Sequence, residues 1–226
     1  MADITPQVLL TKFQKLPRLA RICFLTICCN RVAPLYYAKC GQLMLHLIIP
    51  GKQPLQKVLD VLEIASKYCF NPYLYTRTDL ERAKEEAGSL EGIAFGSKCS
   101  DHAFTVAFAL QELMKCCINV PEAPHDDPYL GCFAHCYSLM IGCTSSVGEE
   151  KVNRQLDRDL DDFLEGMAKN GWTDESPPRG VFVRPGWSLG TPDGWPAVSA
   201  GVTFYGNAII EGIKRAPLSL LGRLFK

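Results

Sequence analysis

The sequence predicts an all-α protein, mostly a multi-helix bundle, followed by a Pro/Gly/Trp-rich C-terminal extension. Up to residue 172, apolar residues recur at steps of three and four, which is typical of helices with one buried face. Beyond Trp172, prolines and glycines interrupt the chain and leave only short extended runs. We therefore expect a helical bundle domain over residues 1–172 and a turn-rich extension over 173–226. With 226 residues, 47% of them hydrophobic, the chain can bury one sizeable core.

Prolines divide the first part of the chain. Thr5 followed by Pro6 is a good helix start, an N-cap with proline at the first helical position. Pro17 then ends a short leading helix, and Pro34 is expected to bend the chain between two further helices. These two helices are expected over residues 19–32 and 35–49.

The remaining helices follow from apolar periodicity and from breakers. A charged helix is expected to end near Ala87, because Gly88, Gly92 and Gly96 follow it. The most regular apolar stripe lies after Gly148 and is closed by Gly171. The expected helices of this part cover residues 54–71, 78–87, 103–118, 130–143 and 149–170, which gives about seven to nine in total. In the extension, residues 181–183 and 202–205 are expected to be extended, and a short helix is expected near the end.

Net charge and cysteine content restrict the function classes. Lysine plus arginine equals aspartate plus glutamate at 24 each, so no overall field favours nucleic acid as a partner. The 11 cysteines are odd in number and lie in apolar runs, which indicates reduced, buried thiols in a cytoplasmic protein. A secretion signal is disfavoured, because the apolar run at 22–29 is short and Asn30-Arg31 follows it. Stable membrane insertion is not expected, since no uninterrupted apolar run approaches the length of a span.

Three stretches carry a resemblance to a known group of proteins. They are LPRLARICFLTICCNRVAPLYYAKCG, PLQKVLDVLEIASK and SKCSDHAFTVAFALQEL, and the first contains a Cys-x-Arg-x-x-Pro-x-Tyr pattern at Cys29, Arg31, Pro34 and Tyr36. In this order they resemble a family of all-helical bacterial proteins that includes immunity proteins of interbacterial toxin systems. The similarity covers residues 9–170 and brings no catalytic residues with it. The chain departs from the family in its extension, and in having Asn30 where an acidic residue commonly stands.

The segment from Glu149 to Glu165 is strongly acidic. A dense carboxylate face on a rigid helix can steer a basic protein partner and occupy its active cleft. The simpler interpretation is a solvated helix surface, since charge runs on helices are usually of that kind. The candidate partner-binding residues are Glu150, Asp157, Asp159, Asp161, Asp162 and Glu165.

Two cysteine and histidine groups allow a different interpretation. Cys132, His135 and Cys136 have helical spacing and suit zinc, with His125 as a further ligand, although the apolar residues around them fit a core helix better. Cys99 and His102 form a candidate thiol-base pair, although Asp101-His102 also fits a helix cap and a surface histidine. We therefore expect no metal, no cofactor and no catalytic residues.

A third interpretation is a peripheral membrane protein. The N-terminal part is rich in lysine and arginine, and residues 213–226 form a cationic, partly amphipathic tail. The aromatic residues of the extension could instead serve as interface anchors. The residues and the resemblance together favour a cytoplasmic, non-catalytic immunity protein that binds a cognate and possibly basic toxin. A Cys/His-dependent enzyme or redox protein and a peripheral membrane protein are the alternatives.

Overall fold

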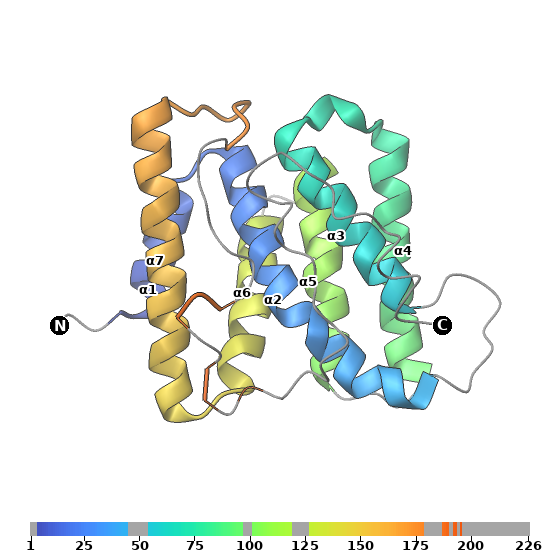
Figure 1. The fold of residues 1–226 in the computed structure, drawn as a ribbon. Coiled ribbons are helices and arrows are strands. Elements are labelled where there is room, and N and C mark those ends of the chain that lie inside the picture. The colour runs from blue at the N-terminus through green and yellow to red at the C-terminus, as the bar shows by residue number, and fades with distance from the viewer. Residues whose placement is uncertain are drawn as a thin grey trace.

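The computed structural model describes residues 4–44, 54–96, 101–118, 127–178, 187–189, 192–193 and 195. Within these residues the chain forms seven α-helices, one short 3-10 turn and no strand, which confirms the all-α bundle (Figure 1). The elements are α1 (Pro6–Gln14), α2 (Arg18–Met44), α3 (Pro54–Phe70), η1 (Pro72–Leu74), α4 (Arg77–Gly96), α5 (Asp101–Ile118), α6 (Pro128–Gly142) and α7 (Ser146–Asn170).

Helix α2 is the centre of the bundle. It packs against α3, α5, α6 and α7, and every side chain from 22 to 36 is buried (Figure 1). The segment Arg18–Tyr36 is long and apolar enough to cross a membrane by length and composition alone. However, 94% of it is buried inside the bundle, as expected for a core helix.

The expected break at Pro34 is wrong, because α2 continues through it to Met44. Proline in a helix lacks the N–H that would bond to the carbonyl four residues earlier, here that of Asn30, at a cost of about 3 kcal/mol. Packing on both sides of Pro34 offsets this cost. One turn after Arg31, Leu35 and Tyr36 are buried, and the Tyr36 hydroxyl donates to the carbonyl of Leu90 on α4 at 2.9 Å. Arg31 therefore lies inside a helix rather than at its C-terminal end.

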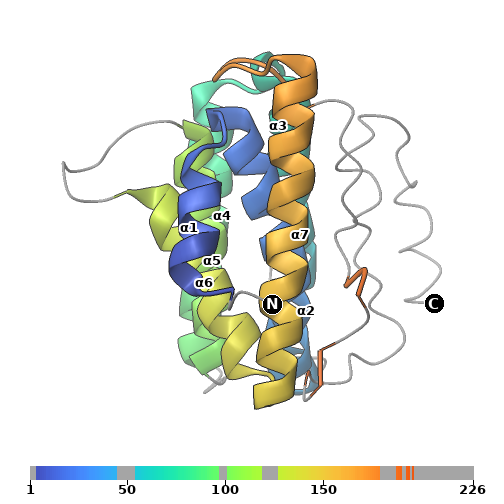
Figure 2. The same ribbon diagram turned by 90° about the vertical axis from the view of Figure 1, so that its left-hand side faces the viewer.

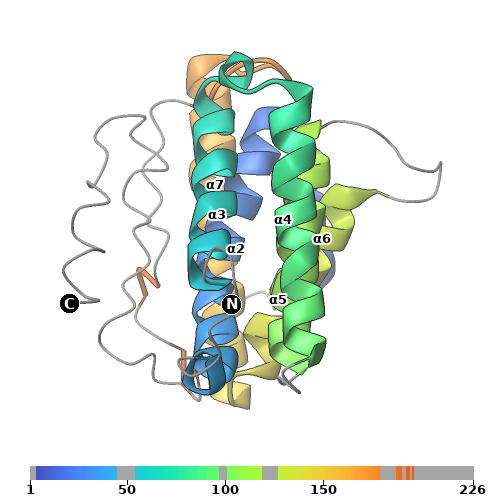
Figure 3. The ribbon, with the colours of Figure 1, turned by 90° about the vertical axis from the view of Figure 1, so that its right-hand side faces the viewer.

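Helix α4 also runs further than the sequence predicts, because Gly88 and Gly92 do not end it. Figure 3 shows α3 and α4 side by side on one face of the bundle, and α4 also packs closely on α5. A Cβ added at Gly88 would lie 3.1 Å from Nε2 of Gln111 on α5. The small residue thus allows the close approach of two helices.

Caps define several helix ends at or near the predicted positions, although α7 begins at Ser146, three residues before the expected start. The Thr5 hydroxyl accepts from the N–H of Val8 at 3.4 Å, and Ser145 does the same for Gly148 at the start of α7 at 3.2 Å. Asp127 caps α6, which therefore begins two residues earlier than expected. Gly171 ends α7 with φ of 60°, a left-handed conformation that favours glycine.

Helices α1 and α7 lie next to each other on one side of the bundle, as Figure 2 shows. Beneath them, aromatic rings from α1, α2, α6 and α7 meet in the core. Phe13 stacks on Phe133 with 5.3 Å between ring centroids, and Phe24 meets Phe163 edge to face at 6.0 Å. Trp172 packs edge to face on Phe163 at 6.3 Å, so the bundle extends to this residue.

Short described pieces of the extension also contact the bundle. Trp187 and Trp195 meet edge to face at 5.1 Å, and the carbonyl of Asp193 accepts from the N–H of Ser145 at 2.8 Å. The expected extended runs at 181–183 and 202–205 and the expected final helix lie outside the described residues.

Candidate functional site

The structure separates the six candidate carboxylates of α7 into different environments. Asp159 is only 2% exposed, so it does not belong to a surface that a partner can reach. Its carboxylate forms an ion pair with Arg31 of α2, with 2.5 Å between Oδ2 and Nη2. This corrects the expectation that Asp159 binds a partner. The cause is its position between Leu156 and Phe163 on the buried face of the helix.

Gln155 of α7 and Trp187 of the extension contact this ion pair, and Ser188 of the extension contacts Gln155. Gln155 donates to Asp159 Oδ1 at 2.8 Å, and its own Oε1 accepts from the Ser188 hydroxyl at 2.8 Å. Trp187 lies over the Arg31 guanidinium at 5.4 Å from the ring centroid. Burial raises the pKa of Asp159, although the attraction of Arg31 opposes this shift.

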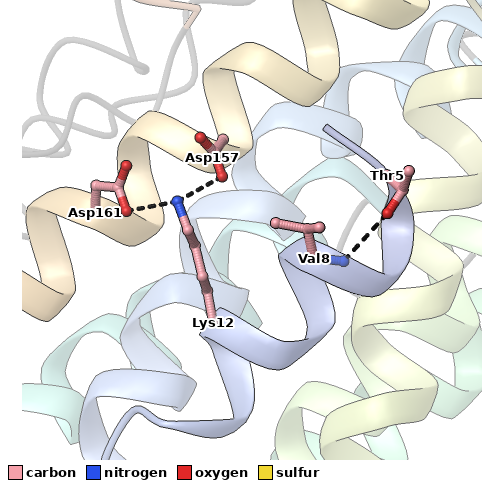
Figure 4. Close-up of polar contacts among 5 residues, drawn as sticks. All are labelled: Thr5, Val8, Lys12, Asp157 and Asp161. Carbon is pink, nitrogen blue, oxygen red and sulfur yellow. Dashed lines mark hydrogen bonds and ion pairs between the residues drawn. The ribbon is translucent and has the colours of Figure 1, made fainter. Parts of the chain in front are cut away.

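Asp157 and Asp161 share one lysine of α1. Lys12 Nζ lies 2.7 Å from Oδ1 of Asp157 and 2.6 Å from Oδ1 of Asp161 (Figure 4). Burial lowers the pKa of Lys12, but the two carboxylates outweigh this and raise it. These two ion pairs join α1 to α7 and neutralise part of the negative charge of α7.

Asp161 and the three carboxylates not yet described reach the surface at least in part. The side chain of Glu150 is 66% exposed and pairs with Arg154, while that of Asp161 is 57% exposed. Glu165 is exposed and Asp162 is half-buried. Partial burial raises the pKa of Asp162; Arg158 lowers it, and the nearby Glu165 and Asp161 raise it further. We call Glu150, Asp161, Asp162 and Glu165 the α7 acidic face.

An exposed apolar pair was not identified from the sequence. Tyr73 and Leu74 of η1 are 87% and 54% exposed, in the turn between α3 and α4. This turn lies at the same end of the bundle as the C-terminal end of α7 (Figure 1). Asn71-Pro72 indicated the turn, but nothing in the pattern showed that the next two side chains would point to solvent.

Three thiols meet in the core. Cys29 of α2 lies 3.7 Å from Cys132 Sγ and 3.6 Å from Cys136 Sγ, and all three residues are fully buried. The expected third member, His135, instead stacks on Phe108 at 5.8 Å between ring centroids. Sequence spacing thus placed the two cysteines of α6 together but gave no sign of Cys29. His125 and Cys99 lie outside the described residues, and His102 is half-buried on α5.

The pKa values of the cluster's thiols are shifted in opposite directions. Hydrogen bonds from the thiols of Cys132 and Cys136 lower the pKa of Cys29 to about 6, although burial opposes this. Burial raises the pKa of Cys132 well above its usual range. The carbonyl of Ala109 on α5 accepts from Cys132 Sγ at 3.3 Å.

Several basic residues near the N-terminus are used inside the protein. Arg18 donates to the carbonyls of Cys116 and Cys117, at 3.3 and 3.0 Å, where cations are favoured at the C-terminal end of α5. The Arg21 guanidinium lies 4.5 Å from the centroid of the Tyr129 ring. Because Arg18, Arg21 and Arg31 contact groups of the protein itself, they do not form a basic surface that could bind a membrane.

Comparison with protein families, curated proteins and solved structures gives no match to this chain. The family resemblance drawn from the sequence therefore has no support from these comparisons.

Proposed function

We propose that this is a cytoplasmic, non-catalytic protein that binds another protein, and specifically an immunity protein that neutralises a cognate bacterial toxin. The observation that carries the proposal is the α7 acidic face, which presents carboxylates at the surface of a 25-residue helix. The helix is held by the core and by Lys12, which contacts Asp161 of the face itself, so the backbone that carries the carboxylates is positioned before a partner arrives. Arg154 and Arg158 lie among these carboxylates and compensate part of the charge, but the net negative charge that remains favours a partner with a basic surface.

The second feature that suits protein binding is the Tyr73 and Leu74 pair. Exposed aromatic side chains are favoured as anchors at protein interfaces, while charges around them mainly increase the association rate. The pair and the C-terminal end of the α7 acidic face lie at one end of the bundle (Figure 1). A basic toxin that contacts both would combine electrostatic steering with an apolar anchor.

The alternative functions have less support from the described residues. A Cys/His enzyme needs a thiol that its substrate can reach, but Cys29, Cys132 and Cys136 are fully buried. A peripheral membrane protein needs a basic surface, but Arg18, Arg21 and Arg31 are engaged with tyrosines, carbonyls and Asp159. Nine cysteines have side chains that the structure describes, and all nine are free thiols, which is compatible with a reducing cytoplasm.

The experiment measures binding of the purified product of each neighbouring gene, by surface plasmon resonance at low and high salt. The test variant is Glu150→Lys/Glu165→Lys, and the matched control is Glu85→Lys, an exposed glutamate on α4. We expect the test variant to slow association by about tenfold at low salt, because the steering field is weakened, and the control to leave it unchanged.

Two results would overturn the proposal at different levels. If a neighbouring product binds and the test variant associates at the wild-type rate, the α7 acidic face is not the binding site. If no neighbouring product binds, and co-expression protects cells from none of them, the immunity function is wrong.

A further inference from the structure

The three-thiol cluster of Cys29, Cys132 and Cys136 has the spacing of a metal site. In a tetrahedral zinc thiolate the Zn–S bonds are about 2.3 Å, which places neighbouring sulfurs about 3.8 Å apart. The Sγ of Cys29 lies 3.7 and 3.6 Å from the other two sulfurs, and all three lie within 4.8 Å of one another. Only small movements would bring all three sulfurs to bonding distance from one central ion.

The backbone holds the cluster in place from two helices. Cys132 and Cys136 are four residues apart on α6, so they project from the same face one turn apart. Cys29 lies in the central helix α2, between the buried residues Cys28 and Asn30. Sites built on packed helices are held more precisely than sites on loops. The arrangement therefore does not depend on a mobile segment.

We infer that Cys29, Cys132 and Cys136 bind one thiophilic metal ion, Zn²⁺ or Cu⁺, inside the bundle. Soft thiolate ligands select these ions over magnesium or calcium. On binding Zn²⁺ the three thiols release up to three protons, and the resulting tris-thiolate complex carries one net negative charge. Cu⁺ is satisfied by three thiolates. Zn²⁺ usually takes a fourth ligand, and among the described residues the cluster supplies the three thiols alone.

The chemistry of the thiols supports this assignment. Metal ligands must be thiolates, and the three neighbouring cysteines supply three sulfurs for one ion once their protons are displaced. Because the sulfurs are fully buried, the ion enters during folding or transient opening and then joins α6 to α2. Such an ion is structural, and its presence does not depend on the proposed toxin binding.

The first test measures metal content and thermal stability. The full chain is purified under reducing conditions from cells supplied with zinc and copper, and bound metal is measured by mass spectrometry. We expect one ion per chain in the wild type, and its loss in Cys29→Ser and Cys136→Ser. The matched control is Cys117→Ser, another fully buried thiol outside the cluster, which should keep the ion.

A second test uses only the wild type, so it remains valid if the serine variants fail to fold. The protein is unfolded with chelator and reductant and then refolded with Zn²⁺ alone, Cu⁺ alone or no metal. We expect one of the two ions to raise the thermal midpoint, and X-ray absorption to show three sulfur ligands around it. Refolding with Co²⁺ should give the thiolate-to-cobalt charge-transfer absorption.

Two outcomes would overturn the inference. One is a wild-type protein that carries neither ion and whose thermal midpoint neither ion changes, which would identify the cluster as dry packing of thiols. The other is metal-free protein with a Cys29–Cys136 disulfide after purification without reductant, which would identify a redox pair instead. Binding of a toxin by metal-free protein would leave the proposed function intact in either case.

Discussion

Arg31 and Asp159 form an ion pair in the interior of the bundle, with 2.5 Å between Nη2 and Oδ2. It joins the central helix α2 to α7, and Trp187 of the extension lies over the guanidinium. The pKa of Asp159 is raised because burial outweighs the attraction of Arg31. The pair therefore does not recover its full desolvation cost, and we attribute to it the positioning of α7 rather than a gain in stability.

The first prediction concerns Arg31→Met, which leaves Asp159 buried without its cation. Near neutral pH we expect the free energy of unfolding to fall by about 3–5 kcal/mol. The pKa of Asp159 in the folded protein, already raised, rises further in the variant. Above the unfolded-state pKa the folded variant keeps a proton that the unfolded chain has released, so stability falls as pH rises through this window. Urea unfolding at several pH values should show the loss shrinking toward acidic pH.

The control for this prediction is the double variant Arg31→Met/Asp159→Asn. The asparagine keeps an oxygen to accept the hydrogen bond of Gln155 but carries no charge. We expect it to recover most of the stability lost in Arg31→Met and to remove the extra pH dependence. Equal destabilisation of Arg31→Met at acidic and neutral pH would show that lost packing, rather than buried charge, is the cause.

Asp159 and Arg31 show which features of the fold the sequence pattern can predict and which it cannot. Periodicity located α7 and its buried stripe, and steps of three and four from Leu156 through Asp159 to Phe163 place the aspartate on that stripe. This spacing indicates a buried aspartate, but the number of acidic residues in the segment favours a position on the surface. The partner Arg31 was not predictable, because periodicity does not show which helices become neighbours in the fold.

Breakers were the least reliable signals. Pro34 and Gly88 were expected to end helices, yet both lie inside helices that continue. Each of these helices makes a long-range contact near the expected break. Tyr36 of α2 bonds to the carbonyl of Leu90, and Gly88 of α4 lies beside Gln111. Such contacts depend on how the whole bundle packs, so the residues near Pro34 or Gly88 in the sequence do not predict them. The same limit explains why Cys29 was not expected beside Cys132 and Cys136.

The second prediction concerns Lys12→Met, which removes the cation shared by Asp157 and Asp161. Both ion pairs are partly buried but still reached by solvent, and such pairs contribute little, so we expect the free energy of unfolding to fall by about 0.5–1 kcal/mol. The α7 acidic face becomes more negative at the same time, and a basic partner should associate faster at low salt. Lys15→Met is the matched control, because Lys15 is an exposed lysine next to α1. If both variants accelerate association equally, net charge rather than the α7 acidic face controls the rate.

The third prediction concerns Gly148→Ala at the start of α7. A Cβ there would lie 2.3 Å from the carbonyl oxygen of Asp193, so the segment at 192–193 must move away. We expect faster proteolysis within residues 173–226 and a change in tryptophan fluorescence, because Trp187 and Trp195 lie beside this segment. Gly92→Ala is the control, since its Cβ meets nothing within 4 Å and alanine favours the helix by about 1 kcal/mol. Unchanged proteolysis in Gly148→Ala would show that the segment does not rest on α7 in solution.

The fourth prediction concerns alkylation of the cysteines in the native protein. Among the nine cysteines whose side chains the structure describes, Cys143 is half-exposed and the other eight are buried. Among these nine, we expect iodoacetamide to label Cys143 first, and peptide mapping to show the buried eight protected until the protein unfolds. Burial protects Cys29 even though hydrogen bonds from Cys132 and Cys136 lower its pKa to about 6, and a bound metal ion would protect it as well. Labelling of Cys29 as fast as Cys143 would show that the core opens to small molecules, and would favour the Cys/His enzyme over the binding protein.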